Sequence, residues 1–518
     1  MLVHEPTKSL LLRVQRPEII ERIIPRTRRV DFEGHNLAVR HGLDETRILR
    51  NLGIVAPPPI LYYYTWPGKY HDCVLSHQKE TAAFCTLYPR CFVLDEPGTC
   101  KTVSTLFAAD YLMSIGAVRR ALIVAPLSTL NLVWADEIFG TLMHRTCAVL
   151  HGDAARRLEL FHNEFDFYVI NHHGLGIVGE ALRCRSDIDL VIVDESAEYR
   201  NSSTDMYADL VEAIGSRRLW LLTGTPCPRS PTDAWAQARL VDKNRVPKYF
   251  TAWKRQTMMQ VSQFKWIPRE DSYKMAFDVL QPAIRHKKAE CIDLPPVLVE
   301  RRQAELTTEQ KKAFATMKNS FVMLNDAATI TAVNAADRIT KLRQILLGAV
   351  RVPNSPEFVE LDHAPRVQLL LDCISQAAGK AIVIVPYKAI IEVLKKTVSQ
   401  MYSCEVVNGD VSKVQRDRIF TAFKHDTDPQ VLLCHPEVMA HGLNLTEADR
   451  TIFYGPIDSN NEDQQVIERF NRHGQTRKMT ITRIGAHPLE WAVYDKVEGQ
   501  KEAQETMLDL YKNEMLGV

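Results

Sequence analysis

Residues 91–113 read CFVLDEPGTCKTVSTLFAADYLM. The apolar run at 92–94 is typical of a buried strand, the Pro-Gly pair that follows predicts a tight turn, and apolar residues at helical spacing begin after Lys101 and Thr102. The backbone N–H groups of such a loop, a Lys ammonium and a hydroxyl that can hold Mg2+ together form a cradle for phosphate. The residues expected to contact a nucleotide here are Gly98, Thr99, Cys100, Lys101 and Thr102.

Cys100 departs from this pattern, because the position before the Lys ordinarily holds Gly. A Cβ in a backbone conformation suited to glycine is destabilising by about 1 kcal/mol or more, and it crowds the ligand. Taken alone, the loop therefore leaves a second interpretation open, an ordinary strand-to-helix turn with a solvated Lys101.

The composition describes a folded chain whose charge is local. Of its 518 residues 46% are hydrophobic, and 64 Lys and Arg stand against 63 Asp and Glu. The length predicts three or four domain-sized units, and the balanced charge excludes a histone-like polybasic protein, so any nucleic-acid surface must be a local patch. The eleven Cys include no CxxC pair and no Cys/His cluster at zinc spacing, which predicts reduced thiols and no structural metal. No apolar run approaches membrane-spanning length and no signal-peptide pattern opens the chain, so we expect a soluble cytoplasmic protein without membrane partners.

Buried-strand patterns alternate with helical ones in two parts of the chain. In the first part the expected strands are residues 90–94, 121–126, 166–171, 190–195 and 218–224. In the second part they are residues 381–387, 404–409, 430–435, 451–455 and 479–484. Continuous apolar strands separated by helices predict parallel sheets covered on both faces, so the fold class is α/β with two similar halves.

Asp194 and Glu195 end the strand expected at 190–195, and ligands bind at the carboxyl ends of parallel strands. Two adjacent acids point in different directions, so one can hold Mg2+ while the other orients an attacking water. We assign Asp194 to magnesium and Glu195 to water activation. Paired acids after a strand are more often a solvated turn, and the assignment depends on their position downstream of the phosphate loop.

Three further side chains are candidates with weaker signals. The amide of Gln78 places a donor beside an acceptor, which suits an adenine edge, although a lone Gln means little. Arg469 and Arg472 lie three residues apart, which predicts one helical face from which both could reach a γ-phosphate. The alternative for the two Arg is an ordinary surface ion pair.

Composition shifts divide the chain into five parts. The connector APPPI at 56–60 closes a first unit in which basic residues exceed acidic ones, with either a DNA-binding or a merely solvated face. The expected boundaries are 1–57 for this accessory domain, 58–285 for a first lobe with a helical insertion at about 227–285, 286–300 for a linker, 301–485 for a second lobe with a helical insertion at about 301–350, and 486–518 for a C-terminal helical brace.

In their order along the chain, the motifs resemble those of superfamily 2 helicase-like ATPases of the Swi/Snf branch. The motifs that carry the resemblance are HQ (77–78), LDEPGTCKT (94–102), APLSTLNLVW (125–134), DES (194–196), LTGTP (222–226), LRQ (342–344), NGDVS (408–412), GLNLT (442–446) and the spaced Gln, Arg and Gly residues of 465–475. The compact size and the stretch at 223–240 are similar to phage-encoded members and annealing-helicase relatives.

The resemblance implies two RecA-like lobes that bind ATP and Mg2+ in the cleft between them and step along double-stranded DNA. It implies that Gln78 reads adenine, that Lys101, Thr102, Asp194 and Glu195 serve phosphate, metal and water as above, and that Gln465, Arg469 and Arg472 complete the site. It places Ser128, Thr129, Gly442 and Asn444 along the DNA path. Family members often translocate without fully separating strands, so we expect remodelling or annealing of double-stranded or branched DNA by a monomer, beside other replication or recombination proteins, in the host cytoplasm if a phage encodes it.

Two residues depart from the family pattern. Cys100 replaces a Gly, and Ala197 stands where the fourth residue of the acidic motif is usually His. Both departures favour a rival reading, a weakly hydrolysing, nucleotide-gated DNA-binding or scaffold protein. A P-loop kinase or metabolic ATPase is a third reading, but it leaves residues 300–485 unexplained.

Overall fold

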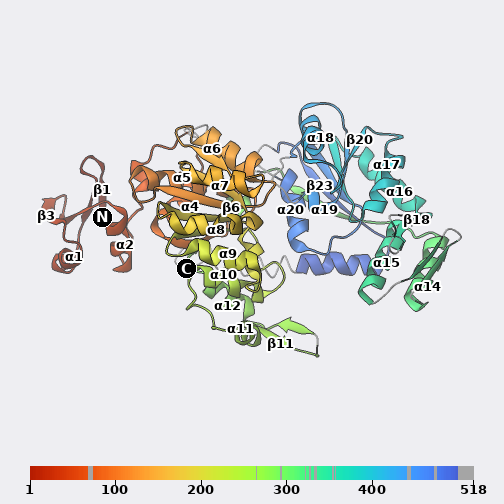
Figure 1. Cartoon of the computed structure of the whole chain (residues 1–518), viewed down its shortest axis with the longest axis horizontal. Coiled ribbons are helices and arrows are strands. Elements are labelled where there is room, and N and C mark those ends of the chain that lie inside the picture. Colours follow the sequence, from red (N-terminus) through yellow and green to blue (C-terminus); the bar gives the residue numbers. More distant parts are fainter. Residues whose placement is uncertain are drawn as a thin grey trace. The chain divides into compact units, whose positions relative to one another are not determined.

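The computed structural model describes residues 1–67, 74–263, 265–291, 294–320, 322–325, 328–331, 335–352, 355, 357–439, 445–471 and 475–499. These residues form two compact units, one that ends at Cys291 and one that follows it along the chain. Each unit contains a parallel sheet with helices packed on it (Figure 1). The expected fold class, α/β with two parallel-sheet lobes, is confirmed.

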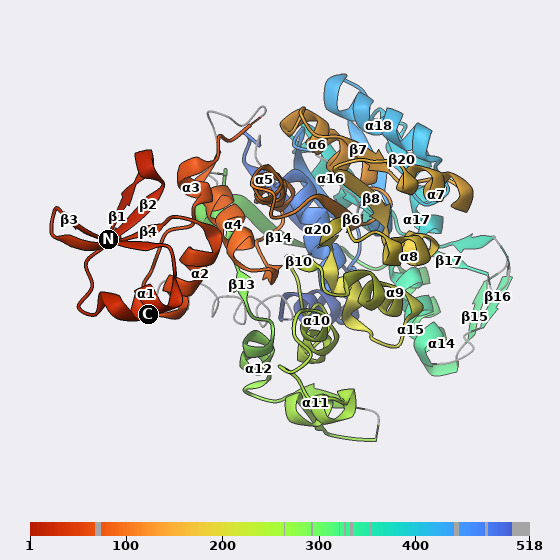
Figure 2. The same ribbon diagram turned by 60° about the vertical axis from the view of Figure 1, so that its left-hand side comes forward.

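The first unit begins with a small antiparallel sheet (Figure 2). Its strand order is β1 (Leu2–His4), β2 (Ser9–Leu12), β4 (His35–Arg40), β3 (Thr27–Phe32), and the helices α1 (Pro17–Ile23) and α2 (Leu43–Asn51) belong to it. Leu10, Leu12, Leu37 and Val39 form its core because alternate residues of a strand share one face. Arg47 of α2 donates hydrogen bonds to the carbonyls of Thr86 and Leu87, the last two residues of helix α4 (Ser76–Leu87). These bonds join the small antiparallel sheet to α4.

The main sheet of the first unit has seven parallel strands in the order β13-β5-β10-β9-β6-β8-β7. The strands are β5 (Arg90–Val93), β6 (Arg120–Ala125), β7 (Cys147–Val149), β8 (Phe167–Asn171), β9 (Ile188–Asp194), β10 (Arg218–Leu222) and β13 (Ala283–Ile284). The accompanying helices are α3 (Ile60–Tyr63), α4 (Ser76–Leu87), α5 (Lys101–Ser114), α6 (Asp136–Thr141), α7 (Ala154–His162), α8 (Leu175–Cys184) and α9 (Asp205–Ile214).

Both faces of this sheet are buried. Leu122 and Val124 of β6 face one apolar core, whereas Ala121, Ile123 and Ala125 face the other. Helices α8 and α9 contribute to the first core and α4 and α5 to the second. This arrangement explains the uninterrupted apolar runs, because a strand with two covered faces has no polar alternation.

All five strands predicted for the first lobe are present, whereas β7 and β13 were not predicted. Their three and two residues are too few to show a period in the sequence. After β10 come the helices α10 (Ala234–Val241), α11 (Phe250–Thr257) and α12 (Ser272–Val279). The same region also contains an unpredicted hairpin of β11 (Met258–Gln260) and β12 (Trp266–Pro268).

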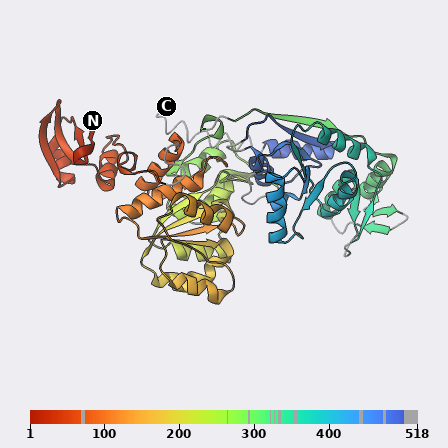
Figure 3. The ribbon, with the colours of Figure 1, turned by 90° about the horizontal axis from the view of Figure 1, so that it is seen from above.

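The second unit has six parallel strands in the order β14-β23-β22-β19-β21-β20, with helices along both sides (Figure 3). The strands are β14 (Val297–Gln303), β19 (Lys380–Ile384), β20 (Cys404–Val407), β21 (Val431–Cys434), β22 (Ala448–Phe453) and β23 (Met479–Gly485). The helices are α14 (Thr308–Ser320), α15 (Ala335–Leu347), α16 (Ala364–Ser375), α17 (Lys388–Val398), α18 (Lys413–His425), α19 (Pro436–Met439) and α20 (Asn460–Phe470). Two hairpins accompany α14 and α15: β15 (Val322–Asn325) with β16 (Ala328–Thr331), and β17 (Ala349–Arg351) with β18 (Phe358–Glu360).

The strand β14 begins at Val297, inside the range expected for the linker, and α13 (Lys288–Cys291) occupies the start of that range. Because β14 is an edge strand with exposed Leu298 and Val299 and three charged residues, it lacks the apolar run of its neighbours. Residues 488–499 of the expected C-terminal brace are helical, and residues 500–518 lie outside the described ranges. No helix within those ranges is long and apolar enough to cross a membrane.

Candidate functional site

Two residues of the loop after β5 have a left-handed backbone conformation, before α5 begins at Lys101. Gly98 has φ 87°, and Cys100 has φ 63° and ψ 41°. The sequence therefore placed the strained residue correctly, since a side chain with a Cβ occupies the conformation that glycine prefers. The half-buried Cys100 packs against the apolar core beneath α5, a contact that offsets part of the strain.

The ammonium of Lys101 is folded onto its own loop. Its Nζ donates to the carbonyl of Asp95 at 2.7 Å and to that of Glu96 at 3.1 Å. Burial lowers the pKa of Lys101, and the nearby carboxylates of Glu195, Asp95 and Asp194 oppose that effect. The structure thus brings the predicted Lys and the two predicted acids of the first unit into one electrostatic neighbourhood.

The loop is also tied together internally. The hydroxyl of Thr99 donates to the carbonyl of Glu96 at 2.7 Å, and its backbone N–H donates to the same oxygen at 3.3 Å. Thr102 is the second residue of α5 and is half-buried. The loop has therefore already folded into a turn that ends at a helix N-terminus, the arrangement that binds phosphate.

Asp194 is the last residue of β9 and is held on both sides. Its Oδ2 accepts from Nε1 of the buried Trp134 at 3.0 Å, and its Oδ1 accepts from the backbone N–H of Glu195 at 3.0 Å. Glu195 has φ 51° and ψ 51°, a left-handed conformation that is unfavourable for a residue with a Cβ. Only β10 separates β9 from β5, so the acids and the phosphate loop emerge about 10 Å apart on the same sheet edge.

Trp134 was missed as a site residue. It lies in a π-helical segment, Leu130–Ala135, of the motif that follows β6. Bulges of this helical type are frequent at functional sites, but their position depends on tertiary packing. The sequence shows only an apolar stretch that contains a Trp. It does not show that the indole N–H of this Trp binds Asp194, which lies far away along the chain.

Gln237 of α10 was also missed, and it connects two motifs. Ser196 Oγ donates to Gln237 Oε1 at 3.4 Å, while Gln237 Nε2 donates to the carbonyls of Pro226 at 2.6 Å and Asp233 at 3.0 Å. The neighbouring Ala197 is buried. The acidic motif is thus joined to the TGTP turn through Ser196 and Gln237, although Ala197 has no polar side chain for that purpose.

The TGTP turn packs closely on the phosphate loop. Thr223 N–H donates to the carbonyl of Val93 at 3.1 Å. A Cβ added to Gly224 would lie 2.5 Å from Cδ of Pro97, far closer than two carbons approach. Glycine is therefore required at position 224 for the turn and the loop to touch.

We expect Gly224→Ala to lower the free energy of unfolding by about 1–3 kcal/mol, because the Pro97 ring cannot move aside without shifting the phosphate loop. Thermal unfolding of the variant measures the effect. Gly179→Ala in α8 is the matched control, since nothing lies within 4 Å of its added Cβ and alanine favours a helix interior. Equal unfolding temperatures for the two variants would contradict the close contact between Gly224 and Pro97.

Gln78, Ser128 and Thr129 lie in the first unit, and the side chains of Gln78 and Thr129 already form hydrogen bonds there. Gln78 is buried on α4, and its Oε1 accepts from the N–H of Leu75 at 2.9 Å, so one half of the amide caps a helix. Thr129 Oγ1 donates to the carbonyl of Pro126 at 2.9 Å. The hydroxyl of Ser128 is buried and has no hydrogen-bond partner among the described residues.

In the second unit α20 carries Gln465, which is half-buried, and Arg469, which is buried. Arg469 Nε donates to the carbonyl of Met439 at 2.9 Å, so part of its guanidinium binds its own unit. The helix ends at Phe470, before position 472. Arg472, Gly442 and Asn444 lie outside the described residues, and their roles stay predictions.

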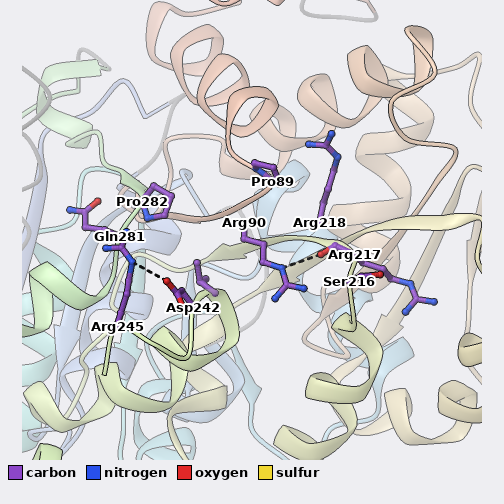
Figure 4. Close-up of a pocket in the computed structure, with 10 residues that line it drawn as sticks. Pro89, Arg90, Ser216, Arg217, Arg218, Asp242, Arg245, Gln281 and Pro282 are labelled. Atoms are coloured by element: carbon purple, nitrogen blue, oxygen red, sulfur yellow. Dashed lines mark hydrogen bonds and ion pairs between the residues drawn. The ribbon is translucent and has the colours of Figure 1, made fainter. Parts of the chain in front are cut away.

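A pocket of about 410 Å³ lies at the opposite edge of the first sheet, where β5 and β10 begin (Figure 4). Its arginines do not converge on one point. Figure 4 shows Arg218 and Arg245 pointing apart, and Arg90 donates to the carbonyls of Gly215 and Arg217. Because Arg90 and Arg217 donate to backbone oxygens and Arg245 pairs with Asp242, the pocket is a weaker candidate for a phosphate site than the loop at 94–102.

Residues 77–353 match the model of the SNF2-related domain, and residues 365–474 match the helicase conserved C-terminal domain. A putative protein p41 of Acyrthosiphon pisum secondary endosymbiont phage 1 is 24% identical over 80% of this chain and 93% of that protein. The CHD3-type chromatin-remodeling factor CHR7 of Arabidopsis thaliana is 22% identical over 82% of this chain, and the chromodomain-helicase-DNA-binding protein 8 of Homo sapiens is 24% identical over 78%.

The chain spans 35% of the length of the plant relative and 17% of that of the human one. Among solved structures, it is similar to the Sulfolobus solfataricus SWI2/SNF2 ATPase core in complex with dsDNA. The TM-score is 0.41 and the identity 17%, over 86% of this chain and 96% of that one.

Proposed function

Because the chain belongs to the SNF2-related family of helicase-like ATPases, we propose that it hydrolyses ATP at the phosphate loop and uses the energy to translocate along double-stranded DNA. The observation that supports the proposal is that the loop before Lys101 and the strand that ends at Asp194 meet the same edge of the first sheet, with only β10 between β5 and β9. The names of the plant and human relatives, a chromatin-remodeling factor and a DNA-binding helicase, support DNA as the partner. Remodelling, such as annealing or fork or recombination remodelling, is the form of activity that we propose.

The residues present fit ATP with Mg2+. Asp194 accepts two N–H bonds, which fix a carboxylate in one orientation, and Thr102 presents a hydroxyl at the helix N-terminus. These two side chains would hold the metal, which supplies positive charge for the phosphate oxygens. Lys101 would exchange the loop carbonyls for phosphate oxygens and neutralise charge that develops on them.

Glu195 would orient the attacking water and accept its proton. Its left-handed backbone turns the chain sharply directly after Asp194, so the two carboxylates leave the strand in different directions. Strained backbone of this kind collects at functional sites, where the surrounding structure maintains it. Gln78, Gly98, Thr99, Cys100 and the second-unit residues Gln465, Arg469 and Arg472 complete the proposed nucleotide contacts, and Ser128, Thr129, Gly442 and Asn444 the proposed DNA contacts.

The rival function is a nucleotide-gated DNA-binding protein that hardly hydrolyses ATP. The left-handed Cys100 and the apolar Ala197 favour it. The hydrogen bonds of Ser196 and Gln237 oppose it, because they connect the acidic motif to the TGTP turn without a His at position 197.

Displacement of the third strand from a DNA triplex tests translocation. We expect release of the third strand that depends on ATP and on an adjoining duplex of sufficient length, without separation of the duplex strands. Release that proceeds equally with a non-hydrolysable ATP analogue would favour the nucleotide-gated reading.

We expect Trp134→Phe to lower the turnover number about tenfold or more, because the ring is kept while the hydrogen bond to the Asp194 carboxylate is lost. Steady-state phosphate release against ATP and Mg2+ concentration measures it. Trp235→Phe is the matched control, since Trp235 donates to the carbonyl of Pro247 at 2.8 Å away from the acids. Equal loss of turnover in both variants would show that Trp134 acts only through stability.

A further inference from the structure

The segment Ile284–Lys288, at the end of the first unit, runs beside the start of the phosphate loop. Leu94 N–H donates to the carbonyl of Ile284 at 2.8 Å, and Glu96 N–H donates to that of His286 at 3.0 Å. The segment therefore extends the pairing of β13 with β5 beyond the strand end and into the loop. Only two residues, Ala289 and Glu290, separate Lys288 from Cys291, where the first unit ends.

Two side chains of this segment hold the two acids of the loop. The His286 backbone N–H and Nδ1 both contact Oδ1 of Asp95, at 2.7 and 2.9 Å, and Thr81 Oγ1 donates to Oδ2 of the same carboxylate at 2.7 Å. Arg285 Nη2 donates to Oε1 of Glu96 at 2.9 Å, and Lys288 N–H donates to Oε2 at 2.8 Å. Asp95 and Arg285 are buried, so these contacts are shielded from water.

The backbone carbonyls of the same two acidic residues also bind Lys101 and Thr99, further along the loop. The carbonyls of Asp95 and Glu96 accept from Lys101 Nζ, and the carbonyl of Glu96 also accepts from Thr99. A displacement of either carboxylate therefore moves the backbone on which Lys101 and Thr99 rest. Asp95 and Glu96 also bring negative charge to a loop that must bind anionic phosphate, and a cationic neighbour offsets that repulsion.

We propose that Arg285 and His286 are positioning residues, which clamp Asp95 and Glu96 so that the phosphate loop keeps the shape and the charge needed to bind phosphate. The clamp acts through the loop and does not touch the nucleotide. Its effect on the loop can be measured without any ligand, whereas its effect on turnover rests on the proposed ATPase function.

The clamp depends on a charged imidazole. Burial disfavours the charge, but the hydrogen bonds and charges of Asp95 and Glu80 outweigh burial and raise the pKa of His286 to about 9 from 6.5. His77, whose ring centroid lies 5.8 Å from that of His286, also faces it, and burial lowers the pKa of His77. Because the folded pKa of His286 is raised, its contribution is complete below about pH 6.5 and is lost as pH rises through about 9.

The test compares His286→Asn, which keeps a donor but loses the charge, with His286→Arg, which keeps the charge and two donors. Amide hydrogen exchange of peptides covering residues 94–100 is measured on the full chain without nucleotide, with the β8 strand as an internal reference. We expect exchange at least tenfold faster in His286→Asn, and close to the wild-type rate in His286→Arg. His144→Asn is the matched control, because His144 also contacts a buried Asp, Asp110, at 2.9 Å.

A second hydrogen-exchange experiment uses the wild-type chain at different pH values and needs no substitution. After correction for the pH dependence of unprotected amides, protection of 94–100 should fall as pH rises through about 9, and it should remain in His286→Arg. Unchanged protection of the loop in both experiments would overturn the clamp. Faster loop exchange in a chain that hydrolyses no ATP at any pH would keep the clamp and contradict the proposed function instead.

Where the chain hydrolyses ATP, kinetics separate positioning from general instability. We expect His286→Asn to raise the KM for ATP at least fivefold with a smaller change in kcat at saturation, and His286→Arg to restore it. A fall in kcat alone, in proportion to the folded fraction, would mean that His286 serves only stability.

Discussion

Lys101→Ala is expected to lower steady-state ATP hydrolysis roughly 10²–10³-fold or more, because a preorganised cation is lost where charge develops on the phosphate oxygens. Double-stranded DNA binding should remain within a small factor of wild type, since the phosphate loop and the proposed DNA path at Ser128 and Thr129 are different surfaces. Phosphate release and fluorescence anisotropy with labelled duplex measure the two properties. Lys274→Ala, on the exposed face of α12, is the control for loss of one lysine charge.

An equal loss of hydrolysis and DNA binding in Lys101→Ala, with an intact thermal transition, would contradict this separation. The contacts of Lys101 make the variant informative. Its Nζ bonds two loop carbonyls, and removing it therefore also loosens the loop, so the thermal transition must be recorded beside the rates.

Glu195→Gln is expected to lower hydrolysis about 10²–10⁴-fold while ATP binding persists, because the amide is isosteric but cannot accept the proton of the attacking water. Nucleotide affinity, measured by equilibrium binding with Mg2+, should change little. Glu198→Gln is the matched control, since Glu198 lies in the same helical turn and is exposed. If the affinity for ATP falls as far as the rate, Glu195 acts on binding and its assignment to water activation is wrong.

The strands of both sheets that were predicted share one physical property, burial on both faces, which leaves an apolar run such as 121–125 in the sequence. The edge strand β14 has exposed Leu298 and Val299 followed by charged residues, and β13 has two residues, so neither leaves such a run. The backbone strain at Cys100 was predictable, because a phosphate-binding loop before a Lys-Thr pair can adopt few backbone conformations. The strain at Glu195 was not, since nothing in its neighbours specifies a left-handed turn.

The residues of the candidate site can likewise be divided into those that the sequence predicts and those that it does not. Lys101, Asp194 and Glu195 could be predicted as candidates because each lies at or after the end of a buried strand, which the apolar run marks in the sequence. Trp134, Gln237 and His286 were missed because their partners lie far away along the chain, and only the fold brings each pair together. The common helical face of Arg469 and Arg472 was inferred from their spacing; Arg469 lies on α20, which ends at Phe470, and Arg472 lies outside the described residues, so the shared face stays a prediction.

The central claim is that the chain is a DNA-stimulated ATPase whose phosphate loop works with Cys100 in place of glycine. Steady-state phosphate release from ATP, with and without double-stranded DNA, tests it most directly on the wild-type chain beside Lys101→Ala and Cys100→Gly. We predict that duplex DNA stimulates the wild-type chain, that Lys101→Ala is silent, and that Cys100→Gly differs from wild type only modestly. A wild-type chain that releases no phosphate with any DNA until Cys100 becomes glycine would contradict the claim and identify a nucleotide-gated DNA-binding protein.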